Sequence, residues 1–594
     1  MSELQTHENK RQQGAYSADV VPAPVGDDGY AVEREDEELA KTHQGEFGTK
    51  RDLVSLINAT AIKSSLGQYH YYSVLSTIYS DGFFDLKPPR VVSMIAIAGT
   101  IGTGLFLGSG GALATGGPVG FWLGYTFIGL SVGCMMMCLG EMSVFAPNVG
   151  GMTDMGNKYV DPAMGFMMGI NYILQVGLAI PAEMSAIAVM IGYWDTNTAH
   201  VPIYIAVFLV VCIAINIVGV RYFGEVEFVF AIIKVSTLIG LIIFGLIADL
   251  GGVPPKHEFI GGRYWRDEPF NDTYLDLQPI SKARFLGFWA VLTKAAFSYG
   301  GIEGISVLAG EAHNPRKTMK MAVKTVFYRI VGIYMLSTLI IGLNISQKSP
   351  DLLTAVALGG GTAASSPFVV ICKQTGVKVL PSIINAVVMT SALSASNENV
   401  YATSRTLMAL ARQRAMPKIF LKTSKAGIPL AGVAVSFCFG LLAFLSVSSG
   451  SNQGFIWLSN LSALSSLVAW ISICICYIRF KKALKAQGIN RNDLTFRSWF
   501  QPYLAWYCVI FFSVILLFNG FASFIGGFNI SNFFASYVTL PVIALCFIGW
   551  KVVKKTKITK LEEIDLSMGP QVALRGTKHD LGATRYETYS REKE

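Results

Sequence analysis

The sequence predicts an all-α integral membrane protein with about twelve transmembrane helices, arranged as two inverted five-helix repeats followed by two C-terminal helices. Three observations lead to this fold class. The 594 residues are 52% hydrophobic and only 15% charged, whereas a soluble domain has about 25% charged residues. Apolar runs long enough to cross a bilayer recur along the chain. The first and the sixth of these runs are interrupted by glycines near their middle, which is the pattern of an inverted repeat with two broken helices.

The predicted membrane domain covers residues 91–552. A helix of about 20 apolar residues spans the roughly 30 Å of hydrocarbon in a bilayer. The first ten spans form the two repeats, about 91–248 and 285–478, and helices within 503–552 follow them. The runs lie near 91–112, 119–144, 163–192, 202–220, 227–248, 285–311, 324–346, 379–411, 428–449, 454–478, 503–524 and 530–552.

The chain begins and ends with polar segments, residues 1–90 and 553–594, which we expect to be disordered tails. No removable signal peptide is expected, because no short apolar core with a small-residue cleavage site precedes the first span. The loops after the sixth, eighth and tenth spans hold clusters of lysine and arginine, namely Arg316, Lys317, Lys320 and Lys324; Arg412, Arg414, Lys418, Lys422 and Lys425; and Arg479, Lys481, Lys482, Lys485, Arg491 and Arg497.

This charge distribution predicts the orientation. The loops after the ninth and eleventh spans have no charge, and the loop 250–283 balances its basic residues with acidic ones. The positive-inside rule then places both termini in the cytosol. The formal net charge of +9 thus belongs to loops that face anionic lipid, which excludes a nucleic-acid surface as its explanation. In loop 250–283, Asn271-Asp272-Thr273 has the sequence of a glycosylation acceptor.

Neither the cysteines nor any other residue cluster predicts a metal, a cofactor or an enzyme. Eight of the nine cysteines lie in apolar runs, Cys372 being the exception. Cys474 and Cys476 project about 200° apart on a helix and cannot clamp one ion. No nucleophile–base constellation is present in the sequence, so no bond chemistry is expected.

The two glycine breaks are the strongest indication of a ligand site. The first reads Gly99-Thr100-Ile101-Gly102-Thr103-Gly104, and the second reads Ser298-Tyr299-Gly300-Gly301-Ile302-Glu303-Gly304. At such a break, unpaired N–H groups at a half-helix N-terminus attract a carboxylate, and freed carbonyls accept from an ammonium. An α-amino acid carries both groups. The alternative is that the glycines only allow close helix packing.

Ionisable residues inside the spans are further candidates, because a charge near the bilayer centre is costly unless it is paired or faces water. They are Glu183, Lys234, Lys294, Glu303 and Glu398. For each of them the alternative is a structural ion pair or a side chain that reaches the interface.

In its motifs the sequence resembles the fungal amino acid permeases of the amino acid/polyamine/organocation superfamily. The resemblance runs from about residue 85 to 555, in order and at family spacing. It is carried by the opening helix around Met94 to Gly110, Gly140-Glu141, Asp161-Pro162-Ala163-Met164-Gly165-Phe166, Pro181-Ala182-Glu183, Gly224-Glu225-Val226-Glu227-Phe228, Ile233-Lys234-Val235, Gly310-Glu311-Ala312-His313-Asn314-Pro315-Arg316-Lys317, Tyr401-Ala402-Thr403-Ser404-Arg405 and Ile478-Arg479-Phe480.

The resemblance implies a proton-coupled amino acid importer of the plasma membrane. By resemblance, the substrate carboxylate would lie on the backbone of Gly102, Thr103 and Gly104. Thr100 and the carbonyls near Phe297, Ser298 and Gly300 would hold the amino group, with Gly301 in the same break and Phe297 as an aromatic gate. Glu183 and Glu303 match family carboxylates that contact substrate or couple protons. Lys234 matches a lysine whose ammonium takes the place of a sodium ion in related carriers.

Two departures from the family pattern concern specificity. The usual Gly-Thr-Glu of the second break reads Gly301-Ile302-Glu303, and a Ser-Ala-Gly-Asn-Ser pattern in span eight reads Ser394-Ala395-Ser396-Asn397-Glu398. Lys294 precedes Phe297 and Ser298 by three and four residues, so it shares their helix face and is expected beside the pocket. There it would contact an acidic substrate, pair with Glu398 or reach the lipid interface.

We therefore expect a carrier that imports an amino acid with a proton by alternating access, favouring neutral amino acids, proline or acidic amino acids over basic ones. Two other functions are open: a non-transporting amino acid sensor of the same fold, and a sodium-coupled symporter, which Lys234 disfavours. Expected partners are the amino acid, the proton, membrane lipid and a ubiquitin ligase or its adaptor on the cytoplasmic tails.

Overall fold

The computed structural model describes residues 101–146, 151–195, 197–218, 220–254, 257–306, 315–357, 366–424, 426–449 and 451–566. The expected disorder of residues 1–90, the end of the chain after 566 and the expected role of Thr100 lie outside these residues.

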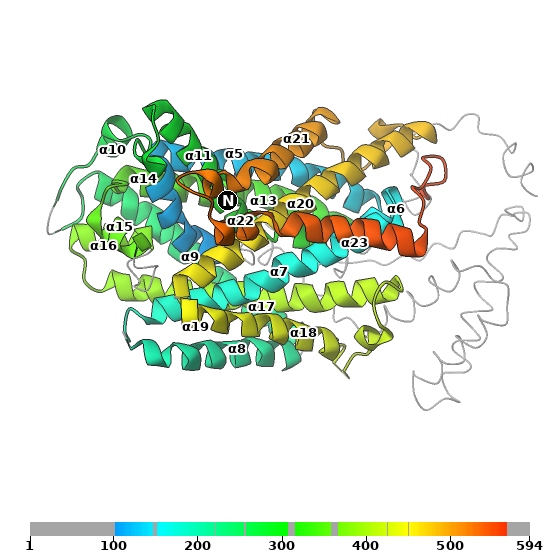
Figure 1. Cartoon of the computed structure of the whole chain (residues 1–594), viewed down its shortest axis with the longest axis horizontal. Coiled ribbons are helices and arrows are strands. Elements are labelled where there is room, and N and C mark those ends of the chain that lie inside the picture. Colours follow the sequence, from blue (N-terminus) through cyan, green and yellow to red (C-terminus); the bar gives the residue numbers. More distant parts are fainter. Residues whose placement is uncertain are drawn as a thin grey trace, which may run out of the picture. The chain divides into compact units, whose positions relative to one another are not determined.

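The described part of the chain is helical and contains no β-strand, apart from one isolated bridge between Leu250 and Phe259. The long helices are α5 (Ser109–Phe145), α7 (Pro162–Ile191), α8 (Val201–Val218), α9 (Val220–Asp249), α11 (Ile280–Tyr299), α13 (Pro315–Arg329), α17 (Leu380–Arg412), α18 (Leu430–Gly440), α20 (Ser451–Ala486), α21 (Tyr503–Phe518) and α23 (Thr539–Lys554). Shorter helices are η1 (Gly104–Gly108), α6 (Met152–Tyr159), α10 (Arg263–Asp267), η4 (Ile302–Gly304), η5 (Ile330–Met335), α14 (Leu336–Asn344), α15 (Pro350–Ala357), α16 (Pro367–Thr375), α19 (Leu445–Ser449) and α22 (Ile530–Tyr537). Figure 1 shows the long helices running alongside one another, with α10, α15 and α16 at one end and α6 at the other.

The prediction of a multi-span membrane protein is confirmed. Among the described residues, eight helical stretches are long and apolar enough to cross a membrane, and the bent pair α22 and α23 makes a ninth. The first two expected spans count once, because a helical stretch continues from Gly104 to Phe145 across a bend at Gly117. The sixth and eighth expected spans correspond to α11 and α17, which are absent from that count. Both helices are less apolar on average because they carry polar residues that are buried in the interior of the bundle.

The interior of the bundle is formed mainly by α5, α7, α11, α17 and α20. Helix α5 packs most extensively on α11, and α7 packs most extensively on α17 and α20. The spans of helices α8 and α9 are the most apolar but are largely exposed in the folded chain. Only 22% and 28% of an 18-residue apolar stretch in each span is buried. We expect their apolar side chains to contact lipid.

The bend in α5 is held by the loop before α11. Gly117 has a φ of +74°, and a Cβ there would lie 2.7 Å from the backbone of Phe270. A residue with a side chain is therefore excluded at Gly117. Next to Phe270, the Asn271 side-chain amide donates to the Ala114 carbonyl at 2.9 Å. This hydrogen bond involves the same nitrogen atom to which a glycan would be attached.

The segment after α23, which belongs to the predicted 553–594 tail, packs against the helical bundle. The guanidinium of Arg479 donates to the Thr559 carbonyl, and the side-chain amide of Gln487 donates to the Ile564 carbonyl at 2.6 Å. Ile564 is itself buried. This part of the tail, which we expected to be disordered, is thus fixed to the end of α20.

Candidate functional site

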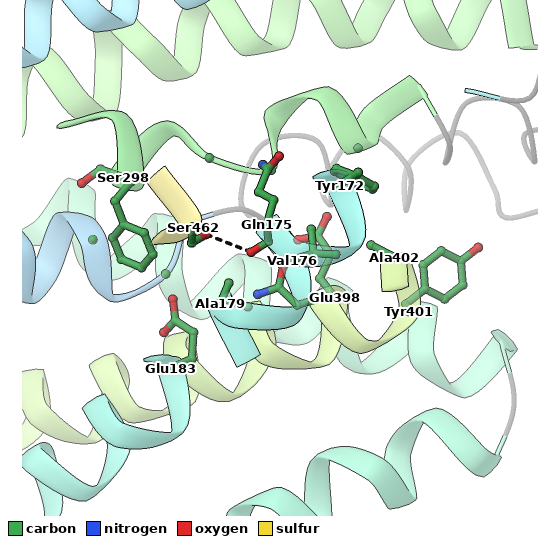
Figure 2. Close-up of a pocket in the computed structure, with 18 residues that line it drawn as sticks. Tyr172, Gln175, Val176, Ala179, Glu183, Ser298, Glu398, Tyr401, Ala402 and Ser462 are labelled. Atoms are coloured by element: carbon green, nitrogen blue, oxygen red, sulfur yellow. Dashed lines mark hydrogen bonds between the residues drawn. The ribbon is translucent and has the colours of Figure 1, made fainter. Parts of the chain in front are cut away.

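A cavity lies where the two glycine breaks meet α7 and α17 (Figure 2). Its volume is about 50 Å³, which is room for a few water molecules at roughly 10–15 Å³ each. Eight of the residues expected from the sequence line it: Gly102, Gly104, Glu183, Phe297, Ser298, Gly300, Gly301 and Glu398. The other lining residues are Tyr172, Gln175, Val176, Ala179, Gly304, Ala395, Asn399, Tyr401, Ala402 and Ser462.

At the first break, a backbone N–H group already binds a carboxylate of the protein. The N–H of Thr103 donates to both carboxylate oxygens of Glu183, at 3.2 and 3.3 Å. A Cβ on Gly102 would lie 2.2 Å from Glu183 Oε1 and 3.1 Å from the Cβ of Ala395. The glycine is therefore required by the close approach of α7 and α17, and its missing side chain is what lets Glu183 reach the backbone.

The second break follows α11 at Tyr299. Gly300 is extended, and Gly301 has a φ of +85°, a conformation that L side chains rarely adopt. The short helix η4 then continues the chain. The Ser298 carbonyl accepts from the Tyr334 hydroxyl at 2.8 Å, so one of the carbonyls freed by the break already has a protein partner.

Tyr125, which we did not single out from the sequence, joins the two breaks. Its hydroxyl lies 2.9 Å from Ser298 Oγ and 3.4 Å from the Gly104 carbonyl, to which it donates. A Cβ on Gly104 would lie 2.7 Å from the Cα of Ser298. The two broken helices thus approach each other closely at Gly104 and Ser298, and the Tyr125 hydroxyl forms hydrogen bonds with both residues.

Glu303 does not line the cavity. Its carboxylate accepts from Trp470 Nε1 at 2.9 Å and from the side-chain amide of Gln175, and it is fully buried. Gln175 itself lines the cavity. Glu303 therefore lies behind one layer of side chains and is connected to the cavity through Gln175.

Lys234 on α9 also lies outside the cavity and is fully buried. Its charge interacts with the carboxylates of Glu227, Glu398 and Glu183. Glu227, part of a motif quoted above but not counted as a site residue, accepts from Ser394 Oγ at 2.5 Å and from Asn397 Nδ2 at 2.7 Å.

The expected position of Lys294 is wrong. Its ammonium donates to the Gly111 carbonyl at 2.9 Å and to Thr115 Oγ1 at 2.6 Å, and the residue does not line the cavity. A long side chain on a helix points back toward the N-terminus. Although Lys294 follows the same face as Phe297, its ammonium consequently lies away from the break. Phe297 and Ser298 do line the cavity, and the ring of Phe297 is edge-on to Phe455.

Two helical stripes complete the cavity wall. On α7 the lining residues are Tyr172, Gln175, Val176, Ala179 and Glu183, and on α17 they are Ala395, Glu398, Asn399 and Ala402. Both sets follow the three- and four-residue spacing of one helix face. The stripes could have been found in the sequence by extending this spacing from each buried carboxylate.

Comparison with known proteins agrees with this architecture. Residues 91–563 match the family model "Amino acid permease". The chain is 40% identical to a dicarboxylic amino acid permease of Saccharomyces cerevisiae over 484 residues, which is 81% of this chain and 79% of the relative. It is 39% identical to a general amino-acid permease of the same yeast over 490 residues, 81% of this chain and 79% of the relative.

A lysine-specific permease of Saccharomyces cerevisiae is equally similar, with 40% identity over 479 residues, 80% of this chain and 77% of the relative. Permeases named for opposite substrate charges thus match this chain to the same degree. Overall identity therefore does not discriminate between substrate classes.

Proposed function

The chain belongs to the amino acid permease family, and from that premise we propose that this transporter imports its amino acid together with a proton, by alternating access. It is a multi-pass membrane protein and not an enzyme. We assign both termini to the cytosol, from the basic loops after the even-numbered spans. The plasma membrane is the location that the resemblance to fungal permeases implies.

One observation carries the proton-coupling proposal: the Glu183 carboxylate on the Thr103 amide. A substrate carboxylate that binds the N–H groups of the first break has to take this donor from Glu183. Two carboxylates at one donor repel each other, and protonation of one of them removes the repulsion. Proton binding to Glu183 and substrate binding therefore favour each other, and this coupling is reciprocal.

In the proposed complex, the substrate carboxylate binds at Gly102 to Gly104 and the ammonium faces the carbonyls near Phe297 and Gly300. The breaks supply the opposite partial charges that this orientation needs. Phe297 borders the cavity on the side of Phe455, as expected of an aromatic gate. Thr100 remains a proposed contact of the amino group.

Sodium independence is supported by Lys234. Its ammonium is buried and its charge interacts with Glu183, Glu227 and Glu398, so the lysine itself takes the place of a cation among these carboxylates. The expected disfavour of basic substrates rested on Lys294 beside the pocket. Since Lys294 does not line the cavity, that reason no longer holds.

The test is uptake of labelled amino acids by yeast cells that lack their own permeases and express the full chain. We expect accumulation that requires an inward proton gradient, stops with a protonophore and is unchanged when sodium is replaced. Accumulation that survives the protonophore in sodium medium would contradict proton coupling. Binding without any accumulation would favour a sensor.

Glu183→Gln is the matched variant, because it removes the titrating group with little change in shape. It should abolish accumulation against a gradient while substrate exchange and surface protein remain. If both the surface protein and the uptake were lost, Glu183 would be needed for folding and not for proton coupling.

A further inference from the structure

The cavity has an acidic end that the backbone breaks do not explain. Within the described residues, the only charged side chains that line the cavity are Glu183 and Glu398. Figure 2 shows Glu183 below Ser298 on one side, and Glu398 among Tyr172, Ala402 and Tyr401 on the other. Glu183 is engaged with the first break, so Glu398 marks the other part of the cavity.

The side chains near Glu398 are polar but neutral. Tyr172, Gln175 and Tyr401 line this part of the cavity (Figure 2), and Asn399, next to Glu398 in the chain, is also a lining residue. The charges of Lys234 and Arg329 interact with Glu398. The guanidinium of Arg405 lies over the ring of Tyr401, 5.3 Å from its centroid. All three cations are buried, and none of them lines the cavity.

The charge balance around the cavity favours an added cation. Four carboxylates, those of the buried Glu183, Glu227 and Glu303 and of the half-buried Glu398, lie in or around the cavity wall. Three buried cations, Lys234, Arg329 and Arg405, lie around it. Buried charges are stabilised by partners of opposite sign, whereas a further carboxylate would raise the repulsion.

Once the breaks fix the carboxylate and the ammonium of the substrate, the side chain extends into the remaining part of the cavity. A cationic side chain would there form charge-assisted hydrogen bonds with Glu398. A side-chain carboxylate would face Glu398 as a like charge, which is an effective way to reject a substrate.

We propose that Glu398 forms the side-chain subsite of this carrier and selects amino acids with a cationic amine or guanidinium over dicarboxylic ones. This inference rests on the proposed transport function and names the substrate class of the same cavity. Glu398 stands where the family pattern described above has a serine.

The experiment measures uptake of labelled lysine, arginine, alanine and glutamate by cells expressing the wild type, Glu398→Gln or Glu398→Ser. In the wild type, lysine or arginine should be taken up at least about tenfold more efficiently than glutamate. Both variants should reduce this ratio by about tenfold or more, while alanine uptake and surface protein are retained. Lys294→Gln, which changes a lysine outside the cavity, should leave the ratio unchanged.

Several results would overturn the inference: a wild type that takes up alanine or glutamate without a preference for cations, variants that keep the preference, or a ratio that follows Lys294 instead. If Glu398→Gln loses all uptake, the ratio of lysine or arginine uptake to glutamate uptake is taken from Glu398→Ser. Loss of all uptake by both variants at normal surface level would assign Glu398 to the transport cycle and contradict a role in specificity. If the wild type accumulates none of the four amino acids, the transport proposal has failed before this inference is tested.

Discussion

At the residue scale, the position of Glu183 depends on an absent side chain. Gly102 leaves the space through which the carboxylate reaches the Thr103 amide, and a Cβ there would lie 2.2 Å from Glu183 Oε1. Gly108 belongs to the same broken helix, but a Cβ there meets no atom within 4 Å. Comparing substitutions at the two glycines therefore tests whether the site needs a glycine at residue 102 or whether small residues are simply favoured along this helix.

We predict that Gly102→Ala reduces accumulation by at least about tenfold, which corresponds to roughly 1.4 kcal/mol, whereas Gly108→Ala leaves it within about twofold. The reason is that the new methyl group displaces Glu183 and also fills the place of the substrate backbone. Initial uptake rates, normalised to surface protein, give the answer. Equal losses in the two variants would mean that the glycines serve packing and that the site is wrongly placed.

At the element scale, the second break depends on backbone conformation. Gly301 has a φ of +85° between the end of α11 and the start of η4. A residue with a Cβ is strained in that conformation at a cost of roughly 1–3 kcal/mol. Gly240 lies within α9, where a Cβ meets no atom within 4 Å.

We predict opposite effects of one substitution at these two positions. Gly301→Ala should lower the melting temperature of the purified protein. Gly240→Ala should keep or raise it, since alanine is a better helix former than glycine by up to about 1 kcal/mol. The measurement is thermal unfolding in detergent. An unchanged melting temperature for Gly301→Ala would show that the break relaxes without strain.

At the scale of the whole molecule, the segment after α23 connects distant parts of the chain. Besides its bonds to Arg479 and Gln487, it includes Leu566, which is buried together with Ile564 in the large core cluster. The N–H of Thr559 donates to the Val160 carbonyl just before α7. The segment therefore ties α7 and α20 together at one end of the bundle.

We predict that a chain ending at Lys554 unfolds at a lower temperature than one ending at Leu566. The longer variant keeps the buried Ile564 and the acceptors of Gln487, and the shorter one leaves those donors without protein partners. Thermal unfolding of the two truncated proteins is the measurement. Equal melting temperatures would show that the docked segment adds no stability.

The sequence by itself determined the features that depend on local composition. The length of each apolar run correctly predicted a helix in the described part of every expected span. The reason is that a segment in lipid has to satisfy its backbone hydrogen bonds within itself. The glycine runs located both breaks, since only glycine combines φ near +85° at Gly301 with the contact distances at Gly102. The cavity-lining carboxylates Glu183 and Glu398 were likewise recognisable as costly charges inside spans.

Only the tertiary structure decided which of these groups meet. Lys294 and Phe297 share a helix face, yet the lysine bonds to α5 and the phenylalanine lines the cavity. Glu303 and Glu398 are both carboxylates inside spans, but Glu398 lines the cavity, whereas Gln175 and Trp470 hold Glu303 behind the cavity wall. Periodicity fixes a residue's place on its own helix. The rotation of each helix and the direction of a long side chain are set by packing against neighbours distant in sequence.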